Sequence, residues 1–143
     1  MKTVIAMGVM IVGVLFLAGC CSVCPGSPKP VVKRIQMVTG IKPEKIAYYK
    51  ELHAHPWPAV TKMIQDCHIR NFSISLKQIE GKYYLFGYFE YVGTDLDADM
   101  KRMAADPETQ RWWKETDPCQ SPLPDAASKG KVWDNMDEVY FLK

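Results

Sequence analysis

The sequence lacks the short motifs that identify several large enzyme classes. No glycine-rich phosphate loop, Gly-x-Ser-x-Gly turn, His-Glu-x-x-His helix or pair of zinc knuckles occurs in its 143 residues. These absences argue against nucleotide-binding enzymes, serine hydrolases of the α/β type and zinc proteases. The chain also lacks a long run of either charge, and its net charge is only +2. A nucleic-acid partner is therefore not expected.

Histidine is scarce as well, and its spacing does not suit a metal site. His53 and His55 are two residues apart, which on a helix directs their side chains to different faces. The third histidine, His68, lies beyond two prolines. The pattern offers no set of ligands at the spacing of a zinc site, so no bound metal is expected.

The chain begins with an apolar run. Apolar residues dominate from Val4 to Ala18, a stretch shorter than the roughly 20 residues that span a bilayer. This pattern predicts an export signal that is removed from the mature protein. Leu17-Ala18-Gly19-Cys20 resembles the lipobox of bacterial lipoproteins, which implies that residues 1–19 are a signal peptide and that Cys20 becomes an acylated N-terminus. The protein is then expected to be lipid-anchored to a bacterial membrane in the cell envelope, on the periplasmic or the outer surface.

Residues 20–33 are rich in proline and carry no apolar periodicity. They predict a semi-extended tether between the lipid anchor and a folded domain at residues 34–143. The remaining cysteines leave the disulfide pattern open. Cys21 and Cys24 lie in the tether, and Cys67 and Cys119 can pair with each other or with them in an exported protein.

The folded domain shows four strand patterns. Residues 35–41 alternate between apolar and polar side chains and predict a first, half-buried strand. Asn71 to Leu76 alternates cleanly, with Phe72, Ile74 and Leu76 on the apolar face. A turn at Glu80-Gly81 leads to Tyr83–Phe89, which is almost wholly apolar and predicts a central strand covered on both faces. Glu138 to Leu142 is the predicted last strand.

Helical patterns lie between these strands. Pro43 and Glu44 open a first helix, which Pro56 and Pro58 interrupt before a second helical piece. A third helix carries an apolar stripe of Leu96, Met100 and Met103 that is expected to face the core, and Asp106-Pro107 predicts the N-cap of a fourth.

The order strand, helix, strand, strand, helix, strand is that of an α+β, ferredoxin-like fold, with an antiparallel sheet and helices on one face. Four strands leave the second face of the sheet uncovered, and an aromatic central strand makes a solvated face costly. We therefore expect a homodimer joined through its sheets, in the manner of a dimeric α/β barrel.

Two pairs of side chains are candidates for a functional site. Tyr49 and His53 are four residues apart on the first predicted helix, so a hydroxyl and an imidazole lie side by side and can meet one ligand. Trp112 and Trp113 are neighbours on a helix and cannot both face the same core, so one of them is expected to line a cavity. Taken alone, each pair is more often explained by ordinary packing or by an exposed helix face than by a functional site.

Several separate segments carry a resemblance to a known family. In order, they are Tyr49-Lys50-Glu51-Leu52-His53, Trp57-Pro58, Arg70-Asn71-Phe72-Ser73-Ile74, Gln110-Arg111-Trp112-Trp113 and Glu138-Val139-Tyr140-Phe141. Their sequence and order resemble the L-rhamnose mutarotase family over residues 34–142. The stretch from Thr116 to Pro124 is similar to a branch of that family with a longer loop before the last strand.

The resemblance implies a ferredoxin-like homodimer with His53 as the proton donor. It also implies that Tyr49, Phe72, Trp112 and Trp113 contact the sugar. The family's usual residue at position 72 is tyrosine, so one hydroxyl and one sugar hydrogen bond are missing here. Phenylalanine can still stack on a sugar.

The implied reaction interconverts the α and β anomers of L-rhamnose or a related 6-deoxyhexose. Opening a cyclic hemiacetal requires a proton at the ring oxygen and removal of another from the anomeric hydroxyl. An imidazole titrates near neutral pH and can perform this acid–base work, so no cofactor is implied.

Two other functions are compatible with the sequence. A surface lipoprotein that binds carbohydrate without turnover would keep the anchor and the pocket, and Phe72 is consistent with it. A cofactor-independent oxygenase can share the same dimeric fold, and the paired tryptophans do not exclude it. Retention of Tyr49 and His53, together with the ordered segments, favours the mutarotase.

Overall fold

The computed structural model describes residues 31–143. The predicted signal peptide, the lipidation site Cys20, and the tether cysteines Cys21 and Cys24 lie outside the described residues. Among residues 31–143, none of the helices combines the length and the apolar character needed to cross a membrane.

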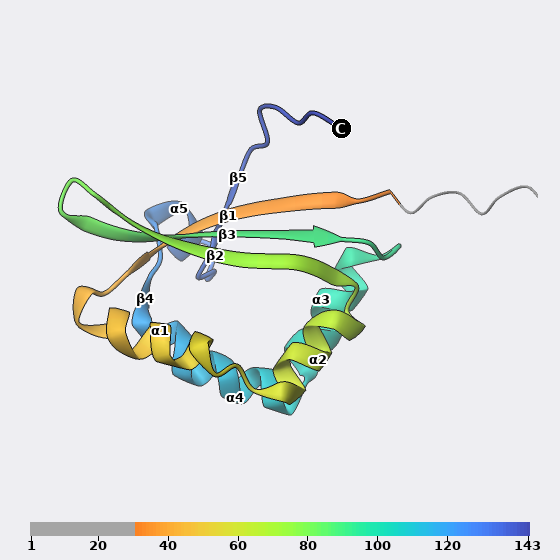
Figure 1. Cartoon of the computed structure of the whole chain (residues 1–143), viewed down its shortest axis with the longest axis horizontal. Helices are drawn as coiled ribbons and strands as arrows, with labels where there is room; N and C mark the ends of the chain where they lie inside the picture. The colour runs from red at the N-terminus through yellow and green to blue at the C-terminus, as the bar shows by residue number, and fades with distance from the viewer. Residues whose placement is uncertain (1–30) are drawn as a thin grey trace, which may run out of the picture.

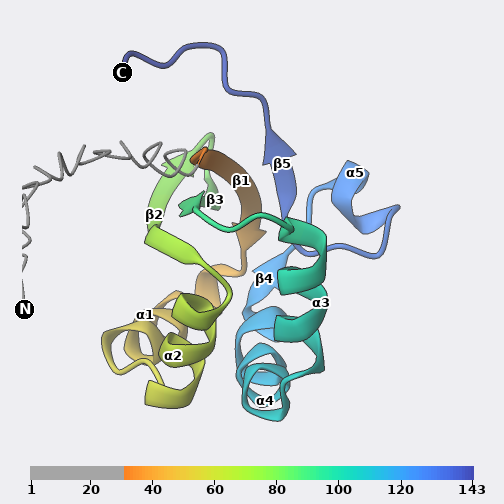
Figure 2. The same ribbon diagram turned by 90° about the vertical axis from the view of Figure 1, so that its right-hand side faces the viewer.

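The described chain forms one antiparallel sheet of five strands. The strands β1 (Lys33–Ile41), β2 (Ile69–Ile79), β3 (Lys82–Tyr91) and β4 (Gln120–Ser121) follow the order β2-β3-β1-β4, and β5 (Asp134–Met136) also pairs with β1. Figure 2 shows that β2, β3 and β1 curl into a half-barrel. The predicted α+β, ferredoxin-like fold is confirmed, and β3 occupies the central position expected for the aromatic strand.

The helices gather on one face of this sheet. Figures 1 and 2 show α1 (Ile46–Ala54) and α2 (Pro58–Asp66) beside α3 (Leu96–Ala105) and α4 (Pro107–Thr116), all on the concave side. A 3-10 turn at Pro43–Lys45 precedes α1, so the regular helix begins slightly later than the sequence predicted. Asp106 caps α4, since its carboxylate accepts a hydrogen bond of 2.8 Å from the Thr109 backbone N–H, as the Asp106-Pro107 pair predicted. A second 3-10 turn (Asp117–Cys119) and the short α5 (Pro124–Ala127) complete the described elements.

A β-bulge interrupts the pairing of β2 with β3. The register shifts between Arg70 and Ser73, so that two residues of β2, Asn71 and Phe72, lie opposite the single residue Phe89 of β3. Asn71 lies in the left-handed region with φ of 51°. The extra residue changes the alternation along β2, because Ile69 before the bulge and Phe72 after it now face the helices on the same side of the sheet.

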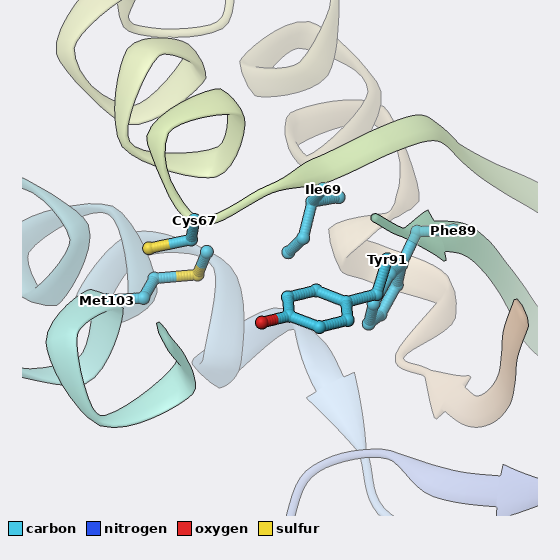
Figure 3. Close-up of a cluster of buried hydrophobic side chains, with 5 residues drawn as sticks. All are labelled: Cys67, Ile69, Phe89, Tyr91 and Met103. Atoms are coloured by element: carbon cyan, nitrogen blue, oxygen red, sulfur yellow. The ribbon is translucent and has the colours of Figure 1, made fainter. Parts of the chain in front are cut away.

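Two clusters of buried side chains fill the space between helices and sheet. The first contains Cys67, Ile69, Phe89, Tyr91 and Met103, and Figure 3 shows the Tyr91 ring at its centre. Met100 packs against it, so the methionine stripe of α3 is core, as predicted. The second contains Ile41, Tyr49, Leu85 and Cys119. Cys67 and Cys119 are buried, free thiols in separate clusters, which answers the open question of whether they pair with each other.

The predicted last strand at Glu138–Leu142 is wrong for the single chain. The last strand is β5, which pairs with Gln36–Val38 of β1, and the residues after Met136 are not in a strand. Glu138 still lies beside Arg34, with two hydrogen bonds of 2.6 Å between guanidinium and carboxylate. Beyond it residues 139–143 form no strand with any other part of residues 31–143 (Figure 1), although the Arg34 guanidinium lies 3.4 Å from the centre of the Phe141 ring. The structure also adds β4 and α5, where the sequence predicted only a loop.

Candidate active site

A cavity of about 760 Å³ opens between α1, α2 and the concave face of the sheet. Its volume is within the range of small-molecule sites and exceeds what a monosaccharide requires. Most of its lining is apolar. The polar and aromatic residues of the lining are Tyr49, Lys50, His53, Thr61, Gln65, Arg70, Asn71, Phe72, Ser73 and Trp112.

His53 presents one free ring nitrogen at this cavity. Its Nδ1 lies 2.9 Å from the carbonyl oxygen of Tyr49, one helical turn earlier. A carbonyl can only accept a hydrogen bond, so Nδ1 carries the proton of the neutral ring and Nε2 carries the lone pair. No other hydrogen bond to this ring is found among residues 31–143. Burial lowers the pKa of His53, and the bond to the Tyr49 carbonyl opposes this shift only in part.

The Tyr49 ring packs against the His53 imidazole. The two rings are stacked with centroids 4.2 Å apart, which confirms that the four-residue spacing brings them together. Only 5% of Tyr49 is exposed, and burial strongly raises the pKa of its phenol. The hydroxyl therefore stays protonated at any physiological pH. No hydrogen bond of this hydroxyl is found within the described part of the chain, so it is available to a ligand.

The two neighbouring tryptophans have different surroundings. Trp112 is 8% exposed, lines the cavity, and places its ring edge-on to His53 at 5.2 Å and to Trp57 at 5.4 Å. Trp113 is 36% exposed and is not part of the cavity wall. One tryptophan of the pair therefore lines the cavity, as expected, while a sugar contact from Trp113 stays a prediction.

Phe72 lies on the opposite wall from the helices. Its ring packs edge-on against Phe89 with centroids 5.8 Å apart, and 44% of the residue remains exposed. The bulge on β2 gives it this orientation, as described above. The ring thus offers an apolar surface at the mouth of the cavity.

Sequence reasoning assigned no role to several polar residues of the lining, among them Lys50, Gln65 and Arg70. Lys50 and Arg70 contribute positive charge, and Gln65 contributes an amide. The Arg70 guanidinium is held by the carbonyl oxygens of Gln65 and Ile69 at 2.8 and 2.7 Å. Thr61 and Gln65 are four residues apart on α2, and this spacing was the available signal. No Asp or Glu is among the described residues that line the cavity.

The remaining histidines lie elsewhere. His55 is exposed, with its Nδ1 3.1 Å from the Glu51 carboxylate, and His68, just before β2, is 2.7 Å from the Asp99 carboxylate of α3; neither histidine lines the cavity. Within residues 31–143, no group of three or more His, Cys, Asp or Glu side chains comes together in a way that could hold a metal ion.

The fold and the cavity define a class of small ferredoxin-like proteins in which a half-buried histidine faces an aromatic pocket. Comparison with known sequences makes this specific. The family model described as L-rhamnose mutarotase matches residues 34–142, and the chain belongs to this family.

Individual relatives agree with this assignment. An L-rhamnose mutarotase of Bacillus subtilis (strain 168) is 29% identical over 112 residues, which cover 78% of this chain and 99% of the relative. A solved L-rhamnose mutarotase from Formosa agariphila superposes with a TM-score of 0.57 at 20% identity, covering 78% of this chain and 99% of that one. The tetracenomycin F2 cyclase of Streptomyces glaucescens shares the fold, with a TM-score of 0.51 at 12% identity and the same coverage. The matched part of this chain therefore corresponds to almost the whole length of each relative.

Proposed function

We propose that this protein is a sugar mutarotase that interconverts the α and β anomers of L-rhamnose or a related 6-deoxyhexose. The observation that carries the proposal is the His53 imidazole, which is held through Nδ1 and presents Nε2 to an aromatic cavity. Membership of the L-rhamnose mutarotase family supplies the substrate class.

The reaction follows from this geometry. Neutral His53 accepts the proton of the anomeric hydroxyl at Nε2, the bond between C1 and the ring oxygen breaks, and C1 becomes an aldehyde carbon. The proton taken from the anomeric hydroxyl passes from Nε2 to the ring oxygen, which becomes a free hydroxyl. Rotation about the C1–C2 bond and the reverse sequence close the ring on the other face. One nitrogen can serve both oxygens because both are bonded to C1.

The surrounding side chains suit a deoxy sugar. Trp112 and Phe72 offer apolar surfaces for the C–H groups of the ring and for the C6 methyl. The Tyr49 hydroxyl, the Gln65 amide and the Arg70 guanidinium are polar groups that can bind sugar oxygens. Trp113 would contribute only to a sugar that extends beyond the cavity.

Anomer exchange measured by NMR tests the proposal directly. The fragment 34–143 should accelerate exchange between the anomeric signals of L-rhamnose, and L-fucose run in parallel should report how strictly the sugar is selected. Binding of L-rhamnose without accelerated exchange would instead favour the carbohydrate-binding lipoprotein.

We further propose that the protein is a homodimer joined through its sheets. None of the helices α1–α4 covers the convex face, to which alternation directs Tyr84, Phe86 and Tyr88 of β3. In the tail after β5, Val139, Tyr140 and Leu142 are also left uncovered by the rest of residues 31–143, with exposed fractions of 98%, 78% and 77%. A second copy would bury both surfaces.

Light scattering on fragment 34–143 should report a dimer at micromolar concentration. Phe86→Glu places a charge at the centre of the convex face and should yield a folded monomer, because an unpaired carboxylate would be buried at the interface. Lys101→Glu, on the exposed side of α3, is the matched control and should stay dimeric. A parent fragment that is monomeric at this concentration would contradict the proposal.

Finally, we propose that the mature protein is a lipoprotein anchored through Cys20 to a bacterial membrane. The support is the sequence Leu17-Ala18-Gly19-Cys20 after an apolar run. Mass spectrometry of protein from bacterial membranes should find a mature chain that starts at Cys20 and carries acyl groups. Cys20→Ala should abolish acylation, whereas Cys21→Ala should leave it intact. A chain that starts elsewhere would remove both the anchor and the membrane location.

A further inference from the structure

Three polar side chains form a network behind the bulge of β2. The Nδ2 group of Asn71 donates a hydrogen bond of 2.7 Å to Glu90 Oε2, and the Tyr88 hydroxyl donates one of 2.9 Å to Glu90 Oε1. Both carboxylate oxygens are therefore engaged. Glu90 and Tyr88 lie two residues apart on β3 and share the convex face of the sheet, opposite the cavity, whereas Asn71 is also among the residues that line the cavity.

This network holds a backbone conformation that few residues adopt. Asn71 has φ of 51°, a left-handed conformation that asparagine tolerates better than most residues other than glycine. Its amide is anchored to Glu90, so the local cost of the left-handed conformation is offset by a charge-assisted hydrogen bond.

The conformation of Asn71 decides where the next side chain points. With Asn71 in the bulge, both Ile69 and Phe72 face the helices, and Phe72 reaches the cavity and the edge of Phe89. Without the extra residue, strict alternation from Ile69 would turn Phe72 to the convex face. The cavity would then lose one of its aromatic walls.

We propose that Asn71 is a positioning residue for sugar binding, which acts through Phe72 and is held by Glu90 and Tyr88 from the far side of the sheet. This inference rests on the proposed mutarotase function for its kinetic consequence. Because His53 and Trp112 are on other elements, the network affects how tightly the sugar is bound and leaves the proton transfer intact.

An exchange of donor and acceptor tests the proposal in fragment 34–143. Asn71→Asp replaces the amide donor by a second carboxylate that faces Glu90. KM for L-rhamnose should rise about tenfold, while kcat should stay within about twofold. A tenfold change corresponds to the coupling energy usually found between two residues in contact, such as Asn71 and Glu90. Adding Glu90→Gln restores the pair in reverse, since the new amide at position 90 donates to the new carboxylate at position 71 and still accepts from Tyr88. The double variant should recover the parent KM.

A second readout does not depend on turnover. Nuclear Overhauser effects between the Phe72 and Phe89 rings should be present in the parent, lost in Asn71→Asp and restored in the double variant. Retention of these effects and of the parent KM in Asn71→Asp would overturn the proposal, as would a double variant that stays as impaired as the single one. If the parent fails to exchange anomers, the proposed function fails, and the ring contacts still decide whether the network positions Phe72.

Discussion

His53→Ala is expected to lower the rate of catalysed anomer exchange about a hundred- to ten-thousand-fold, the usual contribution of a general acid–base residue. Removing the imidazole removes the only group in the described cavity wall whose ordinary pKa is near neutral. The fold should persist, because the His53 side chain is only half-buried. Its one hydrogen bond within residues 31–143, to the Tyr49 carbonyl, lies within α1 and does not join α1 to another element. Exchange NMR measures the rate, and circular dichroism checks the fold.

His55→Ala is the matched control for this variant. His55 is exposed beside Glu51 and lies two residues from His53, on another face of the helix. It should keep nearly the parent rate. Equal losses in the two variants would indicate a structural effect on α1, and a parent rate in folded His53→Ala would end the acid–base role and favour the binding lipoprotein.

The dependence on pH gives the same prediction a second readout. Burial lowers the pKa of His53 below its usual value of 6.5, so the neutral, proton-accepting form prevails at neutral pH. The rate should therefore be level near neutral pH and decline in the acid range as the ring becomes protonated, with the midpoint of the decline below the usual imidazole pKa. The raised pKa of the Tyr49 phenol keeps that group neutral over this range. A rate that still rises with pH above neutrality would contradict the assignment.

The sequence predicted those parts of the site that depend on local geometry. Tyr49 and His53 meet because residues four apart on any helix are neighbours, whatever the helix packs against. The same reasoning could not choose between Trp112 and Trp113, since the choice depends on which face of α4 packs toward α1 and α2. The alternating pattern assigned Phe72 to the correct face of β2. It did not reveal the bulge, which is why Ile69, three residues earlier, faces the same side of the sheet as Phe72.

The prediction for the C-terminal strand failed for a different reason. Residues 138–142 have the composition of a strand, yet strand formation depends on a neighbour that local sequence does not identify. The chain offers β1 as a neighbour only as far as Met136. The two-residue β4 was missed because so short a strand has no periodicity to detect. Local patterns therefore specified α1–α4, the long strands and the contact between Tyr49 and His53, while α5 and the pairing at the sheet edge depended on the tertiary structure.

Trp112→Ala is expected to cost about 3–5 kcal/mol of folding free energy, as truncation of a buried aromatic side chain usually does. Trp112 is 8% exposed and contacts both His53 and Trp57, so its removal leaves a void beside the proposed catalytic ring.

Trp113→Ala is the matched control, because the same chemical change is made one residue away at a position that is 36% exposed. It should cost less than about 1 kcal/mol, as changes near the surface do. Urea denaturation of both variants measures the difference, and exchange NMR on the folded fraction should show a lower rate only for Trp112→Ala. Equal destabilisation of the two variants would mean that α4 packs through a different face, and a greater loss of exchange in Trp113→Ala would place the sugar outside the cavity described above.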